Sequence, residues 1–153
     1  VMMFFLSGCG QNTIVEKNLK DTFGENTEVT VKNDEIKVTT DEGSFQAGGK
    51  VELPDGFPED IYIIDGKIMS SSKNAYGNNS YQVVIKSDSK DIATAKNLYN
   101  QKFTESGWKI TASVDMGNAA MITATKGNKT ANVTLGTEEG QDGMAIMLAV
   151  TEE

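Results

Sequence analysis

Over most of the chain after residue 26, hydrophobic and polar residues alternate, which is typical of β-strands that bury one face. Within residues 27–47 the alternation is interrupted at Asn33-Asp34 and at Asp41-Glu42-Gly43, and both interruptions have the composition of hairpin turns. The pattern predicts a small β-meander. Because so thin a meander is unstable alone, we expect it to pack on the rest of the chain.

The middle of the chain has a less regular pattern. Both prolines lie in Leu53–Pro58 and push the residues before them out of the helical region, which predicts a stiff, extended connector. Apolar runs at Ile61–Ile64 and Ile68-Met69 then predict two strands around a turn at Asp65-Gly66. The stretch Ser70–Ser80 has little hydrophobic drive, so it predicts a mobile loop.

One amphipathic helix is expected after the strand at 81–86. Asp88 or Ser89 can cap it, an apolar stripe recurs at helical spacing, and Gly107 can end it. The stripe consists of Ile92, Ala95, Tyr99 and Phe103. Alternation then predicts strands at about 108–114, 119–126, 129–136 and 144–151. The expected fold class is α+β, an antiparallel sheet in the order β-α-β-β-β-β with one helix on one face, preceded by the meander.

Composition narrows the functions that such a fold can have. Acidic residues outnumber basic ones by 22 to 14, and the formal net charge of −8 disfavours nucleic acid as a partner. The chain has no histidine and no arginine, so it lacks the usual general base at neutral pH. Its single cysteine, Cys9, cannot form an internal disulfide. We therefore expect no cofactor and no bound metal.

The start of the chain carries a targeting pattern. An apolar run leads to Leu6-Ser7-Gly8-Cys9, which resembles the lipobox of bacterial lipoproteins. The resemblance implies that the Cys9 thiol receives a lipid and that the bond before it is cut. The apolar run is too short to span a bilayer but suits the end of a signal peptide. No lysine precedes Cys9, whereas a signal peptide begins with a basic residue, so we expect the natural start to lie upstream.

This pattern gives an expected division of the chain. Residues 1–8 are the end of the signal peptide, 9–26 a lipidated tether with a possible short helix from Thr13 to Gly24, 27–52 the meander, and 53–153 the α+β domain. The expected location is the extracytoplasmic face of the cell membrane. A flexible tether of this length reaches about 20 Å, so the folded part would stay near the membrane.

A second resemblance covers the last two-thirds of the chain. The segment from Leu53 to Glu153 resembles small bacterial extracytoplasmic lipoproteins with a Leu-Pro-x-x-Phe-Pro motif, a following Asp, a tyrosine-bearing helix and a Gly-Trp pair. Here these are Leu53–Pro58, Asp60, Tyr99 and Gly107-Trp108. The resemblance implies a membrane-anchored domain and supplies no catalytic residue.

Three further patterns in the sequence have residue types that could carry chemistry. Ser70–Lys73 matches the Ser-x-x-Lys of penicillin-recognising enzymes, but those residues must begin a helix in a much larger domain. The loop Glu138–Gly143 is acidic but lacks the alternate oxygen spacing of a calcium loop. Five methionines have no cysteine or histidine to help them hold a soft metal, so we expect them to fill the core. They are Met69, Met116, Met121, Met144 and Met147.

The sequence therefore favours a non-catalytic binding or interaction module. The alternatives are a small cell-envelope hydrolase that uses carboxylates and a purely structural envelope lipoprotein. If the helix covers one sheet face, alternation places a short, polar set of residues on the other. This set is either a plain solvated face or a platform for an envelope protein or polar ligand, with Tyr76 at its rim. The candidate binding residues are Tyr76, Gln82, Lys86, Lys109, Thr111, Ser113, Thr130, Asn132 and Thr134.

Overall fold

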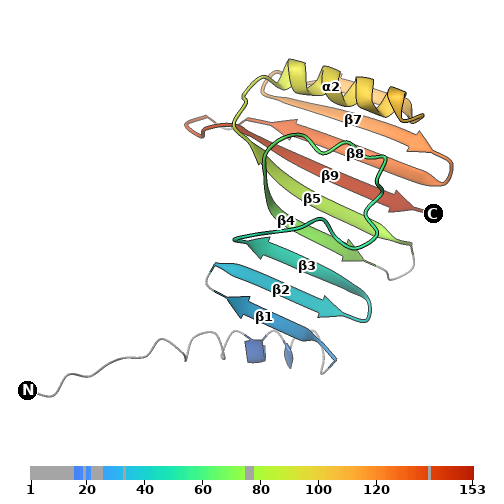
Figure 1. Cartoon of the computed structure of the whole chain (residues 1–153). Coiled ribbons are helices and arrows are strands. Elements are labelled where there is room, and N and C mark those ends of the chain that lie inside the picture. The colour runs from blue at the N-terminus through green and yellow to red at the C-terminus, as the bar shows by residue number, and fades with distance from the viewer. Residues whose placement is uncertain (1–15, 19, 22–25, 33, 75–77, 138) are drawn as a thin grey trace, which may run out of the picture.

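All the strands in the described part of the chain belong to one antiparallel sheet, as the computed structural model in Figure 1 shows. The structure describes residues 16–18, 20–21, 26–32, 34–74, 78–137 and 139–153. The spatial order of the strands is β1-β2-β3-β4-β5-β9-β8-β7-β6. Their bounds are β1 Glu28–Lys32, β2 Glu35–Thr40, β3 Gly43–Gly48, β4 Lys67–Asn74, β5 Ser80–Ser87, β6 Lys109–Asp115, β7 Ala119–Lys126, β8 Lys129–Gly136 and β9 Met144–Glu152.

The predicted fold class is wrong. The chain is a nine-stranded, mostly β structure and not a β-α-β-β-β-β sheet preceded by a separate meander. The expected meander, β1–β3, is the edge of the same sheet, because β3 pairs with β4 along its length. The apolar run Ile61–Ile64 is not a strand but part of the irregular connector between β3 and β4.

Strand β4 is the element that joins the two parts, and the sequence predicted most of it as a loop. Its residues Ser70–Asn74 pair with β3 on one side and with β5 on the other. The hydroxyl of Ser71 is buried and donates a hydrogen bond to the Glu52 carbonyl at 2.7 Å. Two flanking ladders satisfy the backbone of this segment, so its polar composition does not prevent a strand.

The helix α2, Ile92–Glu105, begins and ends through local contacts. Its N-cap is Asp91, not Asp88 or Ser89, and the carboxylate of Asp91 accepts from the Thr94 backbone N–H at 2.9 Å and from the Thr94 hydroxyl at 2.6 Å. These hydrogen bonds lower the pKa of Asp91. At the other end Gly107 has a φ of 78°, and the Trp108 N–H donates to the Phe103 carbonyl at 2.8 Å.

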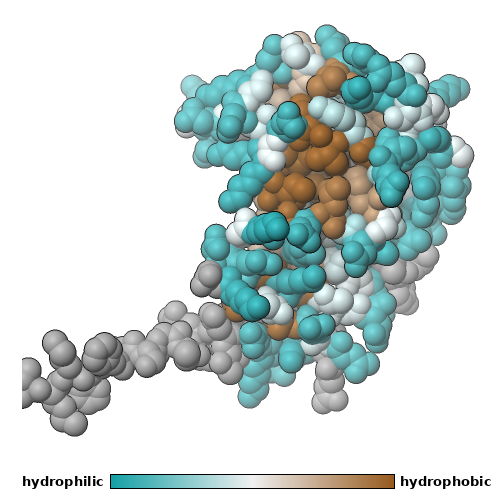
Figure 2. Space-filling view, in the orientation of Figure 1, coloured by the Kyte–Doolittle hydropathy of each residue, from teal (hydrophilic) through white to brown (hydrophobic). Residues whose placement is uncertain are grey.

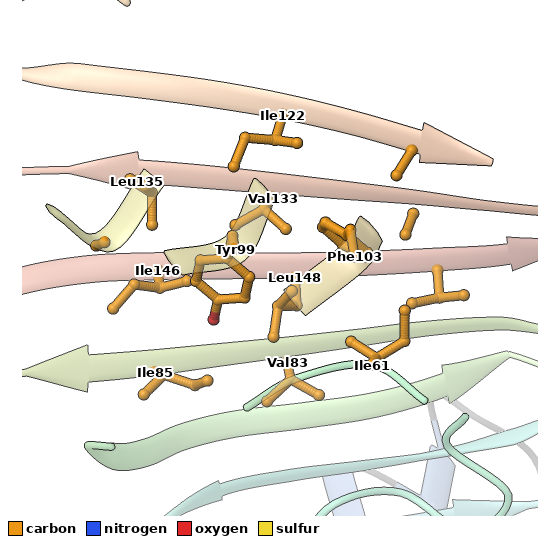
Figure 3. Packing of buried hydrophobic residues seen from close by; sticks show 14 of the residues in the cluster. Ile61, Val83, Ile85, Tyr99, Phe103, Ile122, Val133, Leu135, Ile146 and Leu148 are labelled. Atoms are coloured by element: carbon orange, nitrogen blue, oxygen red, sulfur yellow. The ribbon is translucent and has the colours of Figure 1, made fainter. Parts of the chain in front are cut away.

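One face of α2 packs on β6, β7 and β8, and Figure 3 shows its side chains directed at the sheet. Tyr99 and Phe103 are buried among the side chains of β5, β7, β8 and β9. The rings of Tyr99, Phe103 and Trp108 form a chain of contacts with centroids 6.3 and 5.7 Å apart. The core side chains of the strands are Tyr81, Val83, Ile85, Ala120, Ile122, Ala124, Ala131, Val133, Leu135, Met144, Ile146, Leu148 and Val150.

The connector between β3 and β4 crosses the same face of the sheet as α2 (Figure 1). The Phe57 ring meets Tyr81 edge-on at 6.0 Å, and Tyr62 meets Tyr99 at 5.6 Å. Figure 2 views this side of the molecule and shows an apolar area surrounded by polar residues. The connector therefore supplies a second cover for the core beside the helix.

A β-bulge reverses the alternation in β6. The pairing of β6 with β7 shifts between Ile110 and Ala112, which leaves Thr111 as the extra residue. As a result Val114, which unbroken alternation from Trp108 would place on the core face, is 43% exposed, and Ser113 contacts Asn100 of α2 through a hydrogen bond of 3.4 Å.

Several predictions concern residues outside those that the structure describes. Cys9 and the rest of the expected signal peptide lie there, as does Tyr76. Of the expected tether helix, residues 16–18 and 20–21 are described and are helical. Across the described ranges, no helix combines the length and the apolar character that crossing a membrane requires.

Candidate functional site

The two faces of the sheet can be assigned residue by residue from the strand register. Directly paired residues of an antiparallel ladder share a face, and neighbours along a strand lie on opposite faces. Val83 on β5 and Leu148 on β9 face α2, so the residues that alternate with them face away from it. We call this second surface the open face.

A continuous row of paired residues crosses the open face from β6 to β1. Seven of its nine members are Val, Met, Ile or Ala, and the side chains of Val114, Met121 and Met147 are 43%, 38% and 41% exposed. In spatial order the row is Val114, Met121, Thr134, Met147, Val84, Ser70, Ala47, Ile36 and Val31.

A second row runs beside the first and is more polar at its centre. Three of its side chains bond within the face: the Thr123 hydroxyl donates to Asn132 at 2.9 Å, and the Gln82 amide contacts the Met147 sulfur at 3.0 Å. Phe45 in this row is 43% exposed, whereas Val38 and Val29 are buried. In spatial order the row is Ala112, Thr123, Asn132, Ala149, Gln82, Ser72, Phe45, Val38 and Val29.

Charge is distributed unequally between the two faces. Among the described strand residues, the open face carries Lys67, Lys86 and Lys109 and no Asp or Glu, in a chain with a formal net charge of −8. All strand carboxylates lie on the helix side by register, namely Glu28, Glu35, Asp115 and Glu152.

Lys67 and Lys86 face each other directly across the β4–β5 ladder. Two like charges at paired positions repel each other. The Asp142 carboxylate lines the same hollow as Lys86 but pairs with Lys90 at 3.3 Å. The open face therefore presents a pair of cations without an internal counter-charge among the described ion pairs.

The structure brings most of the predicted binding residues onto this face. Gln82 and Lys86 of β5, Lys109 of β6, and Thr130, Asn132 and Thr134 of β8 lie there by register. Ser113 does not, because the β6 bulge turns it toward α2. Thr111 is the bulged residue, and its hydroxyl donates to the Thr123 carbonyl at 3.2 Å.

The open face also has two shallow hollows along β4, β5 and β9. An apolar hollow of about 200 Å³ lies where Met69 and Val84 meet the β8–β9 loop, with Lys86 in its wall. A polar hollow of about 400 Å³ lies at the other end, lined by Ser72, Gln82 and Thr151 among others. Both are surface depressions beside the strands and not enclosed cavities in the core.

The comparison with known protein families bears on the central part of this sheet. The family model described as START domain-like matches residues 67–143, just over half of the 153 residues. The match begins with β4 and ends before β9, and it includes α2. The chain belongs to the START domain-like family. No curated protein and no solved structure matches the chain.

The helix side of this START domain-like chain has a hollow of its own. It has a volume of about 420 Å³ and lies between the connector and β1–β3. Its lining is largely polar: Glu28, Thr30, Lys37, Thr39, Ser44, Gln46, Glu52, Leu53 and Asp55. Over the described ranges, no three His, Cys, Asp or Glu side chains gather in an arrangement that could hold a metal ion.

The residues weighed for catalysis are not placed to act together. By register Ser70 lies on the open face and Lys73 on the helix side, where its ammonium lies 5.6 Å from the centre of the Tyr81 ring. Tyr99 is buried, and its burial raises the pKa of the phenol, so the group stays protonated at neutral pH.

Sequence reasoning missed the apolar part of the open face. Of the five methionines expected in the core, only Met144 is buried, whereas Met69, Met116, Met121 and Met147 are exposed. The signal was present in β7 and β9, where Met121 and Met147 alternate with the apolar residues that do fill the core. Strands that are apolar at nearly every position indicate two contacted faces.

Proposed function

We propose that this START domain-like chain is a non-catalytic binding module that lipid on Cys9 holds at the extracytoplasmic face of the cell membrane. The lipobox-like sequence Leu6–Cys9 supports the anchor. The open face supports binding, because it combines exposed methionine side chains with lysines that have no carboxylate beside them in the strands. Members of the START-like class are typically binding domains, which agrees with this proposal.

The observation that carries the binding role is the exposed row on the open face. A solvated sheet face is usually polar, with hydrophobic residues reserved for the other side. Here Val114, Met121 and Met147 lie in one row on β6, β7 and β9, with Thr134 of β8 between the two methionines, and all three apolar side chains are exposed. Clustered apolar side chains on a soluble surface typically mark an interaction site.

The anchor is tested by the substitution Cys9→Ser in the full-length protein. One lipidated cysteine carries two acyl chains, and two chains are needed for stable attachment. We expect wild type in the membrane fraction and the variant in the soluble fraction. Unchanged membrane association of the variant would contradict the proposal that Cys9 is the anchor.

The binding role is tested by measuring the reactivity of lysines toward a water-soluble acetylating reagent. In isolated membranes we expect Lys67, Lys86 and Lys109 to react more slowly than in the purified protein. Lys32 and Lys37 lie on the helix side by register and serve as internal controls. Equal reactivity of the open-face lysines in both samples would contradict the proposal that this face binds a partner.

A further inference from the structure

We propose that the partner of the open face is an anionic lipid surface, on which the sheet lies flat with its open face toward the headgroups. This inference rests on the proposed function, because it names the partner of the same surface. The occupant is chosen from the charge and the chemistry of the described residues on that face.

Charge complementarity is the first argument. Lys67, Lys86 and Lys109 all lie on the open face, whose strand positions contain no carboxylate. A lysine near an anionic membrane strengthens attachment roughly five-fold at physiological salt. The directly opposed ammonium groups of Lys67 and Lys86 also repel each other less when lipid phosphates lie between them.

The negative net charge of the molecule does not cancel this attraction. The strand carboxylates lie on the helix side, and α2 and the connector add a further layer on that side. Salt screens charges over about 8 Å at physiological ionic strength, so charges on the far side of a sheet are felt weakly. The described strand positions of the open face are therefore purely cationic, whereas those of the helix side carry five lysines and four carboxylates, so an anionic membrane favours the orientation with the open face toward it.

The shape and apolar character of the open face are the second argument. Small residues such as Ala112, Ala145 and Ala149 alternate there with Met121 and Met147, so exposed thioethers stand above a low surface. Flexible apolar side chains of this kind can enter the headgroup region of a bilayer, while lysines contact the phosphates. A protein partner with an acidic, apolar surface is the competing occupant, and the experiment separates the two.

The single thiol of the chain allows a controlled test in vesicles. The purified full chain is coupled through Cys9 to a maleimide lipid, which fixes it to the surface whether or not Cys9 is lipidated in the cell. One set of vesicles contains phosphatidylglycerol and phosphatidylcholine in equal parts, and the other contains phosphatidylcholine alone. Acetylation rates of Lys67, Lys86 and Lys109 are measured relative to that of Lys102 on α2, which lies on the helix side and is kept in every variant.

On the anionic vesicles we expect the relative acetylation of the open-face lysines to fall at least about three-fold, with no change on neutral vesicles. High salt should abolish the effect. The double substitution Lys67→Glu, Lys86→Glu should also abolish the protection of Lys109. The matched control Lys32→Glu, Lys37→Glu makes the same change in net charge on the helix side. In this variant Lys109 should stay protected from acetylation.

Two results would overturn the inference. The first is equal reactivity on anionic and neutral vesicles, and the second is equal loss of protection in the open-face and control variants. Protection in native membranes without protection on protein-free anionic vesicles would assign the face to a protein partner. That result would leave the proposed binding role intact, so the two proposals fail separately.

Discussion

The Asp60 carboxylate holds the connector to the rest of the molecule. Its Oδ2 accepts a hydrogen bond from the Trp108 indole N–H at 3.1 Å and from the Lys126 ammonium at 2.6 Å. The same ammonium donates to the Ser106 carbonyl at 2.8 Å, at the end of α2. One carboxylate thus joins the connector, the helix C-terminus and β7. Asp60 and Trp108 both belong to the lipoprotein-like pattern in the sequence, which gave no indication that they touch.

Asp60→Asn should lower the free energy of unfolding by about 1–2 kcal/mol at pH 7, because a charge-assisted contact is lost. Although partial burial raises the pKa of Asp60, Lys126 and Trp108 outweigh it and hold the pKa below its usual value of 3.8. The stabilisation is therefore complete above that value and is lost as the pH falls through the lowered pKa.

Urea denaturation of wild type and Asp60→Asn at pH 7 and at about pH 3 measures this difference. The difference in the free energy of unfolding between wild type and Asp60→Asn should be smaller at the lower pH. Asp65→Asn changes an exposed carboxyl in the same connector and should leave stability unchanged. A gap for Asp60→Asn that is equal at both pH values would contradict the assigned role.

Trp108 closes the aromatic part of the core, where its ring lies 5.7 Å from Phe103 and is 3% exposed. Trp108→Ala and Phe103→Ala should each cost roughly 3–5 kcal/mol, a large share of the stability of a domain this size. Trp108→Phe keeps most of the ring volume but removes the bond to Asp60, so it should cost less. Chemical denaturation that gives under about 1 kcal/mol for both alanine variants would contradict this packing.

At the scale of elements, strands with regular alternation could be predicted from the sequence, whereas strands, bulges and connectors without it could not. The strands predicted at 119–126 and 129–136 have those bounds, because Gly127-Asn128 is a two-residue hairpin turn between clear period-two patterns. The helix was also evident from its apolar stripe, although its cap was placed two or three residues too early. Each of these signals is local.

The elements that were predicted wrongly depend on contacts between residues distant in sequence. Ser70–Asn74 forms a strand because β3 and β5 lie on either side of it, which its own composition does not reveal. The run Ile61–Ile64 is apolar because the connector covers the core, not because it is paired. The bulge at Thr111 has no sequence signature, yet it decides which side of β6 meets the helix.

The bulge can be tested by comparing a substitution on the exposed side of β6 with one on the buried side of β7. Val114→Lys should change the free energy of unfolding by less than about 0.5 kcal/mol, because Val114 is exposed on the open face. Ile122→Ala, on the buried side of the neighbouring β7, should cost roughly 2–5 kcal/mol. If Val114→Lys destabilises the protein as strongly as Ile122→Ala, then β6 has the unbulged register that simple alternation predicts.

At the scale of the whole molecule, the nine strands form one continuous sheet, but the buried apolar residues of its two parts lie on opposite faces. On the β5–β9 side the apolar residues face α2 and the connector. On the β1–β3 side they lie on the opposite surface, where Val29 and Val38 are buried and the helix side is polar. The hydrophobic face therefore changes sides at β4, a strand whose residues are mostly polar on both faces.

This change of side predicts that β1–β3 stabilises β4 more than it stabilises β8 and β9. A shortened chain of residues 53–153 lacks the β3 ladder and also the Glu52 carbonyl that accepts from Ser71. Strand β4 would then be a polar edge strand paired only with β5, and such edges open readily. Strands β8 and β9 keep both neighbours and their contact with the core.

Amide hydrogen exchange of the full Cys9→Ser chain and of residues 53–153 measures this directly. We expect the backbone amides of Ser70–Asn74 to lose nearly all protection in the short chain, while those of β8 and β9 keep most of theirs. Domain boundaries fall where few contacts cross, so this outcome would support the predicted division at residues 52 and 53. Loss of protection in β8 and β9 together with β4 would instead show that all nine strands unfold as one cooperative unit, with β1–β3 indispensable to it.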